Sequence, residues 1–287
     1  MYPASFDYHR PASLAEAAHL LKNDPDARLL AGGHSLLPAM RLRLSVPTAL
    51  VDLSGIAGLA GIGAAGGGLV IGAMTTHAAV ADSAAVRSAC PLLAETAAQI
   101  GDLQVRNRGT IGGSLAHADP AADYPAPLTA LGATLEIGGA AARTVAVEGF
   151  FQGLFTTDLQ PGEIVTAVHV PAYGPGTGGA YVKHRHPASG FAVVGVAALV
   201  TVEGGKCAKV SLVVGGVQAN PVRAQAAEAA LTGQAPGEAA FAAAAAKVAE
   251  SLTKPLSDLY ASGEFRVHLA GVLAKRALAQ ATGRAGA

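Results

Sequence analysis

The sequence predicts an α+β protein made of three consecutive segments, residues 1–55, 56–175 and 176–287. Stretches with the period of a core-facing helix alternate with short apolar runs that are typical of strands. Residues 1–55 have a β-α-β pattern, and hairpins with glycine-rich turns follow after residue 55. A proline- and glycine-rich stretch at 171–179 is the strongest linker signal in the chain. We therefore expect two α/β subdomains followed by a small α+β C-terminal domain.

The first segment is expected to hold a helix at residues 13–22 and a small β-α-β unit. Ser13 and Glu16 have the spacing of a capping box, in which two side chains satisfy backbone amides at the start of a helix. Apolar residues then recur with the period of a helix that faces a core. The β-α-β unit comprises a strand at 28–31, a helical turn at 36–42 and a strand at 49–53.

The second segment is expected to mix hairpins with helices. A glycine-rich turn at 64–68 joins two short strands. Thr75 or Thr76 can cap a helix that runs to about residue 82. The other expected elements are helices at 91–100 and 125–131, and strands at 133–137, 144–147 and 164–170.

The third segment predicts an antiparallel hairpin followed by three alanine-rich helices. The hairpin strands lie at 191–202 and 208–214. The helices are expected at 223–231, 238–251 and 264–281. Alanine is the best helix former, so this composition requires no special function.

The composition excludes several classes of protein. Twenty basic residues balance 20 acidic ones, which gives no electrostatic case for binding nucleic acid or an anionic membrane. A hydrophobic content of 51% excludes a disordered chain. Cys90 and Cys207 are too few for a disulfide framework or a four-thiolate cluster. No apolar run approaches the ~20 residues of a membrane-spanning helix, and the start lacks a secretory-signal pattern, so we expect a cytoplasmic protein.

Two glycine pairs stand out among the 36 glycines. Gly32-Gly33 lies between a predicted strand and a helical turn, and Gly112-Gly113 belongs to a second loop with the same Gly-Gly-Ser core. Adjacent glycines in this setting let successive backbone amides point into one concavity, which suits an anion. Neither loop matches the dinucleotide fingerprint or the P-loop. From the residues alone, plain turns and a site for a pyrophosphate-bearing cofactor both stay open.

A family resemblance extends over essentially the full length of the chain. It is carried by the stretches Ser5–Pro11, Ala31–Arg43, Val70–Thr76, Val105–Gly109, Thr110–Ser114 and Glu264–Arg276. These resemble the FAD-binding medium subunit of molybdenum hydroxylases, above all the flavoprotein subunit of the aerobic carbon monoxide dehydrogenases. The resemblance implies an FAD-binding domain of the vanillyl-alcohol-oxidase (PCMH) type and a smaller α+β C-terminal domain.

The resemblance also implies which residues contact the cofactor. Both glycine loops are expected to bind the FAD pyrophosphate through backbone amides, and Asp123 to hold cofactor hydroxyls. Phe191 falls beside the isoalloxazine, and Lys183 lies in the strand that approaches it. The residues so assigned are Ala31, Gly32, Gly33, His34, Ser35, Leu36, Thr110, Ile111, Gly112, Gly113, Ser114, Asp123, Lys183 and Phe191.

Two positions depart from the family pattern. Ser114 stands where many relatives have Asn, and it can still donate one hydrogen bond. Phe191 replaces a common Tyr, so it keeps a ring to pack on the flavin and loses the phenol. The two cysteines cannot supply the additional [4Fe-4S] cluster of some relatives, and we expect no metal ligand in this chain.

Simpler interpretations stay open for several of these residues. Ser35 and Thr110 are also suited to cap helices, and Asp123 to cap the helix that follows it. Phe191 has the character of a core strand residue. His34 is better interpreted as a polar loop residue than as an acid or base, and no catalytic residue is expected.

The resemblance implies an electron-transfer subunit. Electrons would come from two [2Fe-2S] clusters on a small subunit, supplied by a molybdopterin-type cofactor on a large subunit. They would leave through FAD to an external acceptor such as a quinone, in a dimer of heterotrimers. One alternative is the same subunit in a hydroxylase of an N-heterocycle or an aldehyde. A free-standing flavin oxidoreductase is disfavoured, because the chain has no obvious substrate-cap domain or covalent flavin attachment residue.

Overall fold

A small parallel sheet forms the N-terminal part of the structure, a computed structural model that describes residues 2–286. Its strands are β1 (Asp7–His9), β2 (Arg28–Leu30) and β3 (Ala49–Asp52), in the order β1-β3-β2. The helices are α1 (Leu14–Asn23) and α2 (Leu36–Arg41), with a 3-10 turn at Leu53–Gly55. The expected β-α-β unit is present, and the Ser13 hydroxyl accepts the Glu16 amide as predicted.

The second sheet is antiparallel and carries a layer of short helices. Its strands are β4 (Ile62–Ala65), β5 (Gly68–Gly72), β6 (Thr134–Gly139), β7 (Arg143–Ala146) and β10 (Glu163–Pro171), in the order β4-β5-β10-β6-β7. The helices are α3 (His77–Asp82), α4 (Ala84–Ala89), α5 (Pro91–Ala98), α6 (Leu103–Arg108), α7 (Ile111–His117) and α8 (Pro125–Ala130). A separate hairpin joins β8 (Phe151–Gly153) to β9 (Thr156–Thr157).

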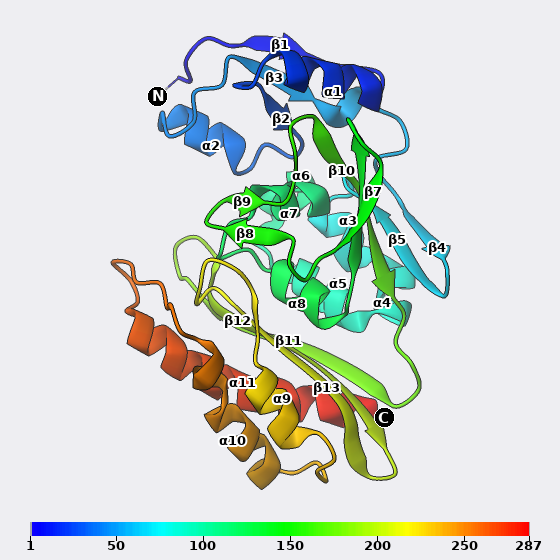
Figure 1. The fold of residues 1–287 in the computed structure, drawn as a ribbon, viewed down its shortest axis with the longest axis vertical. Coiled ribbons are helices and arrows are strands. Elements are labelled where there is room, and N and C mark those ends of the chain that lie inside the picture. Colours follow the sequence, from blue (N-terminus) through cyan, green and yellow to red (C-terminus); the bar gives the residue numbers. More distant parts are fainter. Residues whose placement is uncertain (1, 287) are drawn as a thin grey trace.

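A third sheet and its helices complete the fold. The strands are β11 (Thr177–Arg185), β12 (Ala192–Glu203), β13 (Lys206–Gly215) and β14 (Val222–Arg223), in that order. The helices are α9 (Gln225–Leu231), α10 (Glu238–Ala246) and α11 (Gly263–Ala285), with a 3-10 turn at Val248–Ser251. Helix α11 packs along β11 and β12, while α5 and α8 contact this sheet from the other side (Figure 1).

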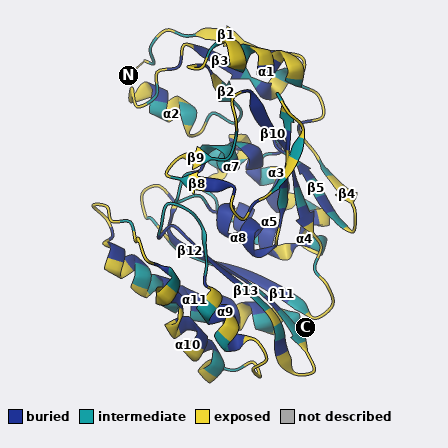
Figure 2. Cartoon of the chain, viewed as in Figure 1, coloured by how far each residue is buried: buried dark blue, intermediate teal, exposed yellow. Residues whose placement is uncertain are grey.

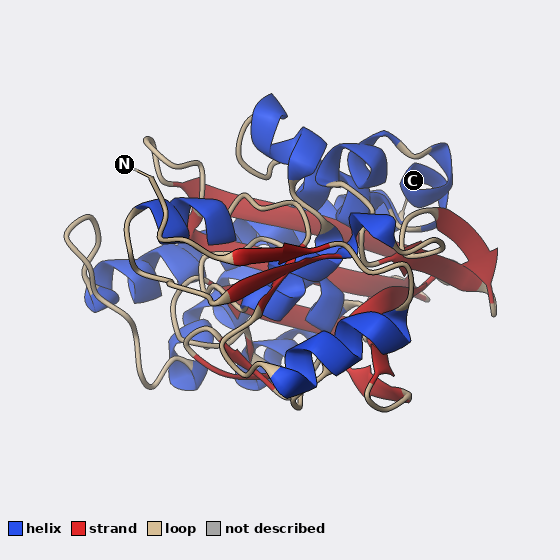
Figure 3. Ribbon diagram, turned by 90° about the horizontal axis from the view of Figure 1, so that it is seen from above, coloured by secondary structure: helices blue, strands red, loops and turns tan. Residues whose placement is uncertain are grey.

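Burial follows this layered arrangement. The long strands of the third sheet are buried between helices, and the outer faces of α10 and α11 are exposed (Figure 2). Seen from above, helices lie on both sides of the strands (Figure 3). Side chains of the third sheet, among them Tyr181 and Ala197, belong to the same core as Leu92 and Leu128 of the second layer. No helix within residues 2–286 has both the length and the hydropathy needed to cross a bilayer.

Several elements differ from the sequence-based expectation. Helices α4 and α6 and the β8–β9 hairpin were not expected, because each is too short to show a clear period. The second glycine pair lies in the first turn of α7 instead of in a loop. Strand β11 already begins at Thr177, so the linker is shorter than the stretch 171–179. The division of the chain into residues 1–55, 56–175 and 176–287 stays a prediction.

The early start of β11 has a packing explanation. A Cβ on Gly178 would overlap the Ala281 carbonyl oxygen and approach the Ala285 nitrogen to 2.5 Å, both on helix α11. A Cβ on Gly179 would lie 3.0 Å from Cζ of Tyr173 and 3.1 Å from Cβ of Leu92. These glycines therefore permit close packing on both faces of the strand, although the stretch that contains them has the composition of a flexible linker.

The contact between β11 and α11 can be tested with glycine substitutions. Gly178→Ala should lower the free energy of unfolding by about 1–3 kcal/mol, because the added methyl forces strand and helix apart. The matched control is Gly283→Ala, an exposed position of α11 where an added Cβ meets nothing within 4 Å. That control should be neutral or stabilising by up to about 1 kcal/mol, since alanine favours helix. Urea unfolding followed by circular dichroism measures both, and equal stabilities would refute the packing explanation.

Candidate functional site

The two glycine pairs line one cavity of about 620 Å³. The cavity extends from α1 and β2, past both glycine pairs, to the turn that precedes β12. Its volume is in the range of small-molecule and cofactor sites. Twelve of the fourteen residues assigned from the sequence line it; Ile111 and Lys183 do not.

The first loop offers unused hydrogen-bond donors at the start of α2. The amides of Gly33, His34 and Ser35 donate to no group within residues 2–286. The Ser35 hydroxyl makes no capping bond, so the expectation that it is an ordinary helix cap is not met. Gly33 has φ +75°, which explains the glycine at this position. His34 Nδ1 lies 3.0 Å from the Gly32 carbonyl oxygen, as befits a polar loop residue.

Gly32 brings the first loop against the backbone that leads into the second. A Cβ at Gly32 would overlap the Arg108 carbonyl oxygen and lie 2.7 Å from the Gly109 Cα. No other residue type allows this approach without a backbone shift. The two glycine pairs, far apart in the sequence, therefore border the same cavity because the chain backbones touch here.

The second glycine pair is held by the segment 73–77. The Ile111 amide donates to the Thr75 carbonyl at 3.0 Å, and the Gly112 amide to the Ala73 carbonyl at 2.8 Å. Thr110 caps α7 by accepting the Gly113 amide at 3.1 Å. A Cβ on Gly112 would overlap the Cβ of Ala73, which requires glycine.

This arrangement changes the role expected for the second loop. The amides of residues 111–113 already donate inside the protein, and Ile111 is fully buried. Backbone amides free to bind an anion are therefore concentrated in the first loop. The second pair borders the cavity with small residues, and Ser114 adds a hydroxyl that makes no hydrogen bond to the described residues.

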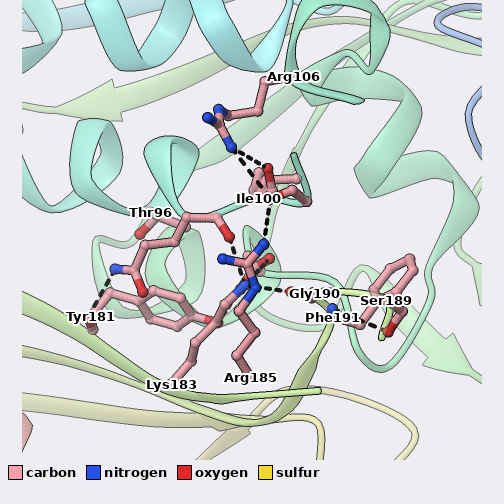
Figure 4. Close-up of polar contacts among 12 residues, drawn as sticks. Thr96, Ile100, Arg106, Tyr181, Lys183, Arg185, Ser189, Gly190 and Phe191 are labelled. Atoms are coloured by element: carbon pink, nitrogen blue, oxygen red, sulfur yellow. Dashed lines mark hydrogen bonds and ion pairs between the residues drawn. The ribbon is translucent and has the colours of Figure 1, made fainter. Parts of the chain in front are cut away.

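Asp123 and Lys183 form a buried ion pair beneath the cavity. Lys183 Nζ lies 2.9 and 3.0 Å from the two carboxylate oxygens, and it donates to the Gln99 carbonyl at 2.8 Å. It also donates to the Gly190 carbonyl at 3.0 Å (Figure 4). The Tyr181 hydroxyl donates to the same carboxylate at 2.7 Å. The ammonium group is thus saturated by protein acceptors, and Lys183 positions Asp123 at the cavity wall without reaching the cavity itself.

Burial and charge oppose each other in this pair. Burial raises the pKa of Asp123 and lowers the pKa of Lys183, and the attraction between the two groups opposes both shifts. Asp123 does not cap α8, whose cap residue is Tyr124. The simpler capping role considered for Asp123 is therefore excluded.

Phe191 sits on a tight turn at the far end of the cavity. The His186 amide donates to the Phe191 carbonyl at 2.8 Å, and the Gly190 amide to the His186 carbonyl at 2.9 Å. The Phe191 residue is 43% exposed, which excludes a simple core role. Arg185 fixes the base of the turn by donating to the Gly101 carbonyl (Figure 4).

Several cavity residues were missed by sequence reasoning. Most are apolar and belong to strands or their ends, where they have the character of core residues: Leu29, Leu53, Met74, Ile164 and Val165. His77 was also missed, although it directly follows Val70–Thr76, one of the stretches that carry the family resemblance. Burial lowers the pKa of His77 to about 4, helped by His34 and Arg106, so its ring is neutral at pH 7.

Comparisons with known proteins match nearly the whole chain. Residues 4–173 match the family model described as the FAD binding domain in molybdopterin dehydrogenase, and residues 179–281 match the CO dehydrogenase flavoprotein C-terminal domain. The carbon monoxide dehydrogenase medium chain of Afipia carboxidovorans is 43% identical over 99% of each chain. The glyceraldehyde dehydrogenase medium chain of Sulfolobus acidocaldarius is 36% identical, over 96% of this chain and 98% of its own. The solved carbon monoxide dehydrogenase of Hydrogenophaga pseudoflava that lacks the Mo-pyranopterin moiety has a chain with TM-score 0.95 and 42% identity, covering 99% of both chains.

The buried ion pair predicts a charge-specific loss of stability. Lys183→Met leaves the Asp123 carboxylate buried without its cation, so the free energy of unfolding should fall by about 3–5 kcal/mol. An unpaired buried carboxylate has a raised pKa in the folded state. The difference in the free energy of unfolding between the variant and the wild type should therefore shrink as the pH falls and Asp123 becomes protonated.

The double variant Lys183→Met/Asp123→Leu removes both charges and should recover most of the loss. Lys247→Met breaks an exposed pair with Glu250 and serves as the control, with little expected effect. Urea unfolding at several pH values measures all variants. A deficit that the double variant does not relieve would contradict the charge-pair explanation.

Proposed function

The chain belongs to the family of FAD-binding medium subunits of molybdopterin dehydrogenases, and we propose that it is the flavoprotein subunit of an aerobic molybdenum-containing carbon monoxide dehydrogenase. The comparisons confirm the resemblance drawn from the sequence, the α+β fold class and FAD as the cofactor. The chain is accordingly an oxidoreductase subunit that works with a large and a small partner subunit.

The observation that carries the proposal is the shared cavity. Both glycine pairs, the Asp123 carboxylate and the Phe191 ring border it, and its free amides lie at the start of α2. Such amides suit a pyrophosphate, a buried carboxylate edge suits hydroxyls, and an exposed aromatic ring suits a flat heterocycle. The cavity extends continuously between these features, so the residues present fit FAD.

Each residue has a distinct proposed task. The amides of Gly33, His34 and Ser35 hold the pyrophosphate, with Thr110 and Ser114 facing it from the other side. Asp123, fixed by Lys183 and Tyr181, holds hydroxyls of the cofactor. The remaining assigned residues shape the walls through small or apolar side chains: Ala31, Gly32, Leu36, Gly112 and Gly113, with Ile111 buried behind them.

Phe191 supplies a ring surface that packs on the isoalloxazine and keeps water from it. When bound, FAD supplies the redox chemistry, in which electrons arrive from the partner subunits and leave to an external acceptor. The chain contributes binding, orientation and shielding, and no side chain of it has to act on the substrate of the holoenzyme.

The finer assembly is also part of the proposal. We place two [2Fe-2S] clusters on the small subunit and the molybdopterin-type cofactor on the large one, in a cytoplasmic dimer of heterotrimers. The external acceptor is proposed to be a quinone or a similar two-electron carrier. The formal net charge of zero disfavours a nucleic-acid partner.

A second candidate is the medium subunit of a related hydroxylase with another substrate. A glyceraldehyde dehydrogenase medium chain and a chain of quinoline 2-oxidoreductase are both 36% identical, so an aldehyde and an N-heterocycle are both candidates for that substrate. Copurification from the native host, with metal analysis and activity assays on carbon monoxide, glyceraldehyde and quinoline, separates the two candidates. A monomeric chain without molybdenum and iron would refute both.

FAD binding itself is tested by adding a methyl group in the space between the two glycine loops. A Cβ on Gly113 would lie 2.8 Å from Thr110 Oγ1 and 3.5 Å from Ala31 Cβ, so Gly113→Ala should fold yet narrow the cavity. We expect the FAD dissociation constant to rise about tenfold or more, equivalent to ~1.4 kcal/mol. Gly63→Ala, on β4 with open space around the new methyl, is the matched control. Flavin fluorescence titration measures both, and unchanged affinity in Gly113→Ala would refute the assigned site.

A further inference from the structure

His77 lines the cavity but has no task in the proposal above. It is the first residue of α3, and it is only 5% exposed. Its amide donates to the Gly109 carbonyl at 2.9 Å. A Cβ on Gly109 would lie 2.6 Å from His77 Nε2, so the ring packs directly on that glycine. Because Gly32 touches the same backbone, His77 stands where the two glycine loops meet.

The imidazole has no hydrogen-bond partner within residues 2–286. Its Nδ1 atom is fully buried without a partner. Its Nε2 atom also lacks a partner, and it lies against Gly109, which lines the same cavity. A buried N–H group without an acceptor is costly and rare, so the ring nitrogen that carries the proton requires an acceptor from outside the chain.

The surroundings determine which nitrogen carries the proton. The ring packs against Tyr124 at a centroid distance of 5.3 Å and an interplanar angle of 57°, and the nearby titratable groups that lower its pKa are His34 and Arg106. Burial and the absence of a carboxylate among these groups keep the imidazole neutral, so it carries a single proton. A proton on Nδ1 would bury an N–H without an acceptor, which is the less favourable of the two possibilities. The proton therefore resides on Nε2, next to the cavity.

We propose that His77 is an FAD-binding residue, in which the neutral imidazole donates a hydrogen bond from Nε2 to a pyrophosphate oxygen between the two glycine loops. This inference rests on the proposed function, since it requires FAD in the cavity. A donor at this place compensates for the amides of residues 111–113, which are occupied by bonds to Ala73, Thr75 and Thr110. His77 thus adds a side-chain donor beside the second loop, where the amides of residues 111–113 are already occupied.

The test compares His77→Phe with His77→Gln in the full chain. Phenylalanine retains the packing on Tyr124 and removes the donor, whereas glutamine keeps an N–H group. We expect His77→Phe to weaken FAD binding about tenfold to a hundredfold, the loss of one hydrogen bond to a charged acceptor. His77→Gln should lose less. His19→Phe, on the exposed face of α1, is the control and should bind like the wild type.

Stability of the FAD-free chain separates binding from a structural role. Because His77 lacks partners in the protein, FAD-free His77→Phe should melt at the same temperature as the wild type or higher. A lower melting temperature with unchanged FAD affinity would mean that His77 is only structural, and would overturn the inference. Nitrogen-15 NMR of the ring gives an independent measure, with Nε2 protonated and shifted when FAD is added.

The outcomes also distinguish this inference from the proposed function. If the wild type fails to bind FAD, the proposed function fails and the role of His77 fails with it. If the wild type binds FAD and His77→Phe binds equally well, only the role of His77 is overturned. Should His77→Phe not fold, a His77 ring signal that FAD leaves unchanged in the wild type overturns it as well.

Discussion

The cavity depends on close backbone contact between three stretches of chain. Gly32 rests on Arg108–Gly109, and the segment 73–77 pairs with 109–112 through main-chain hydrogen bonds. Each contact needs a glycine because a Cβ would overlap a neighbouring backbone or Cβ atom. The glycines that first suggested ligand binding thus act largely by packing. They hold two loops at the separation that leaves a cavity between them.

The C-terminal sheet takes part in the same construction. Lys183 on β11 binds the Asp123 carboxylate and two main-chain carbonyls, and Arg185 binds the turn after α5. Separating the partners of a buried ion pair leaves an uncompensated charge, so the pair resists arrangements in which Asp123 and Lys183 move apart. Here it fixes one wall of the cavity to the sheet that also carries Phe191. The third sheet therefore positions the site as well as enclosing the core.

The sequence predicted the long periodic elements well, and it singled out two glycine pairs that the structure places at one cavity. Helix α1, strand β12 and helix α11 have clear patterns, and the loops resemble a known family. Three kinds of feature could not be predicted from the sequence. Six-residue helices such as α6 lack a readable period, and the glycines of β11 have the composition of a linker. The partners of the Ile111 and Gly112 amides, and of Lys183, come from distant parts of the chain, so local sequence could not reveal them.

The residues that line the cavity are spread along the chain from Leu21 to Phe191. This has a consequence for biosynthesis. A growing chain cannot enclose a ligand until the turn that carries Phe191 has left the ribosome and β11 has paired with β12. A complete cavity therefore requires the β11–β12 turn of the third sheet in addition to the first two sheets. A chain truncated before β12 would keep both glycine loops and still lack a complete site.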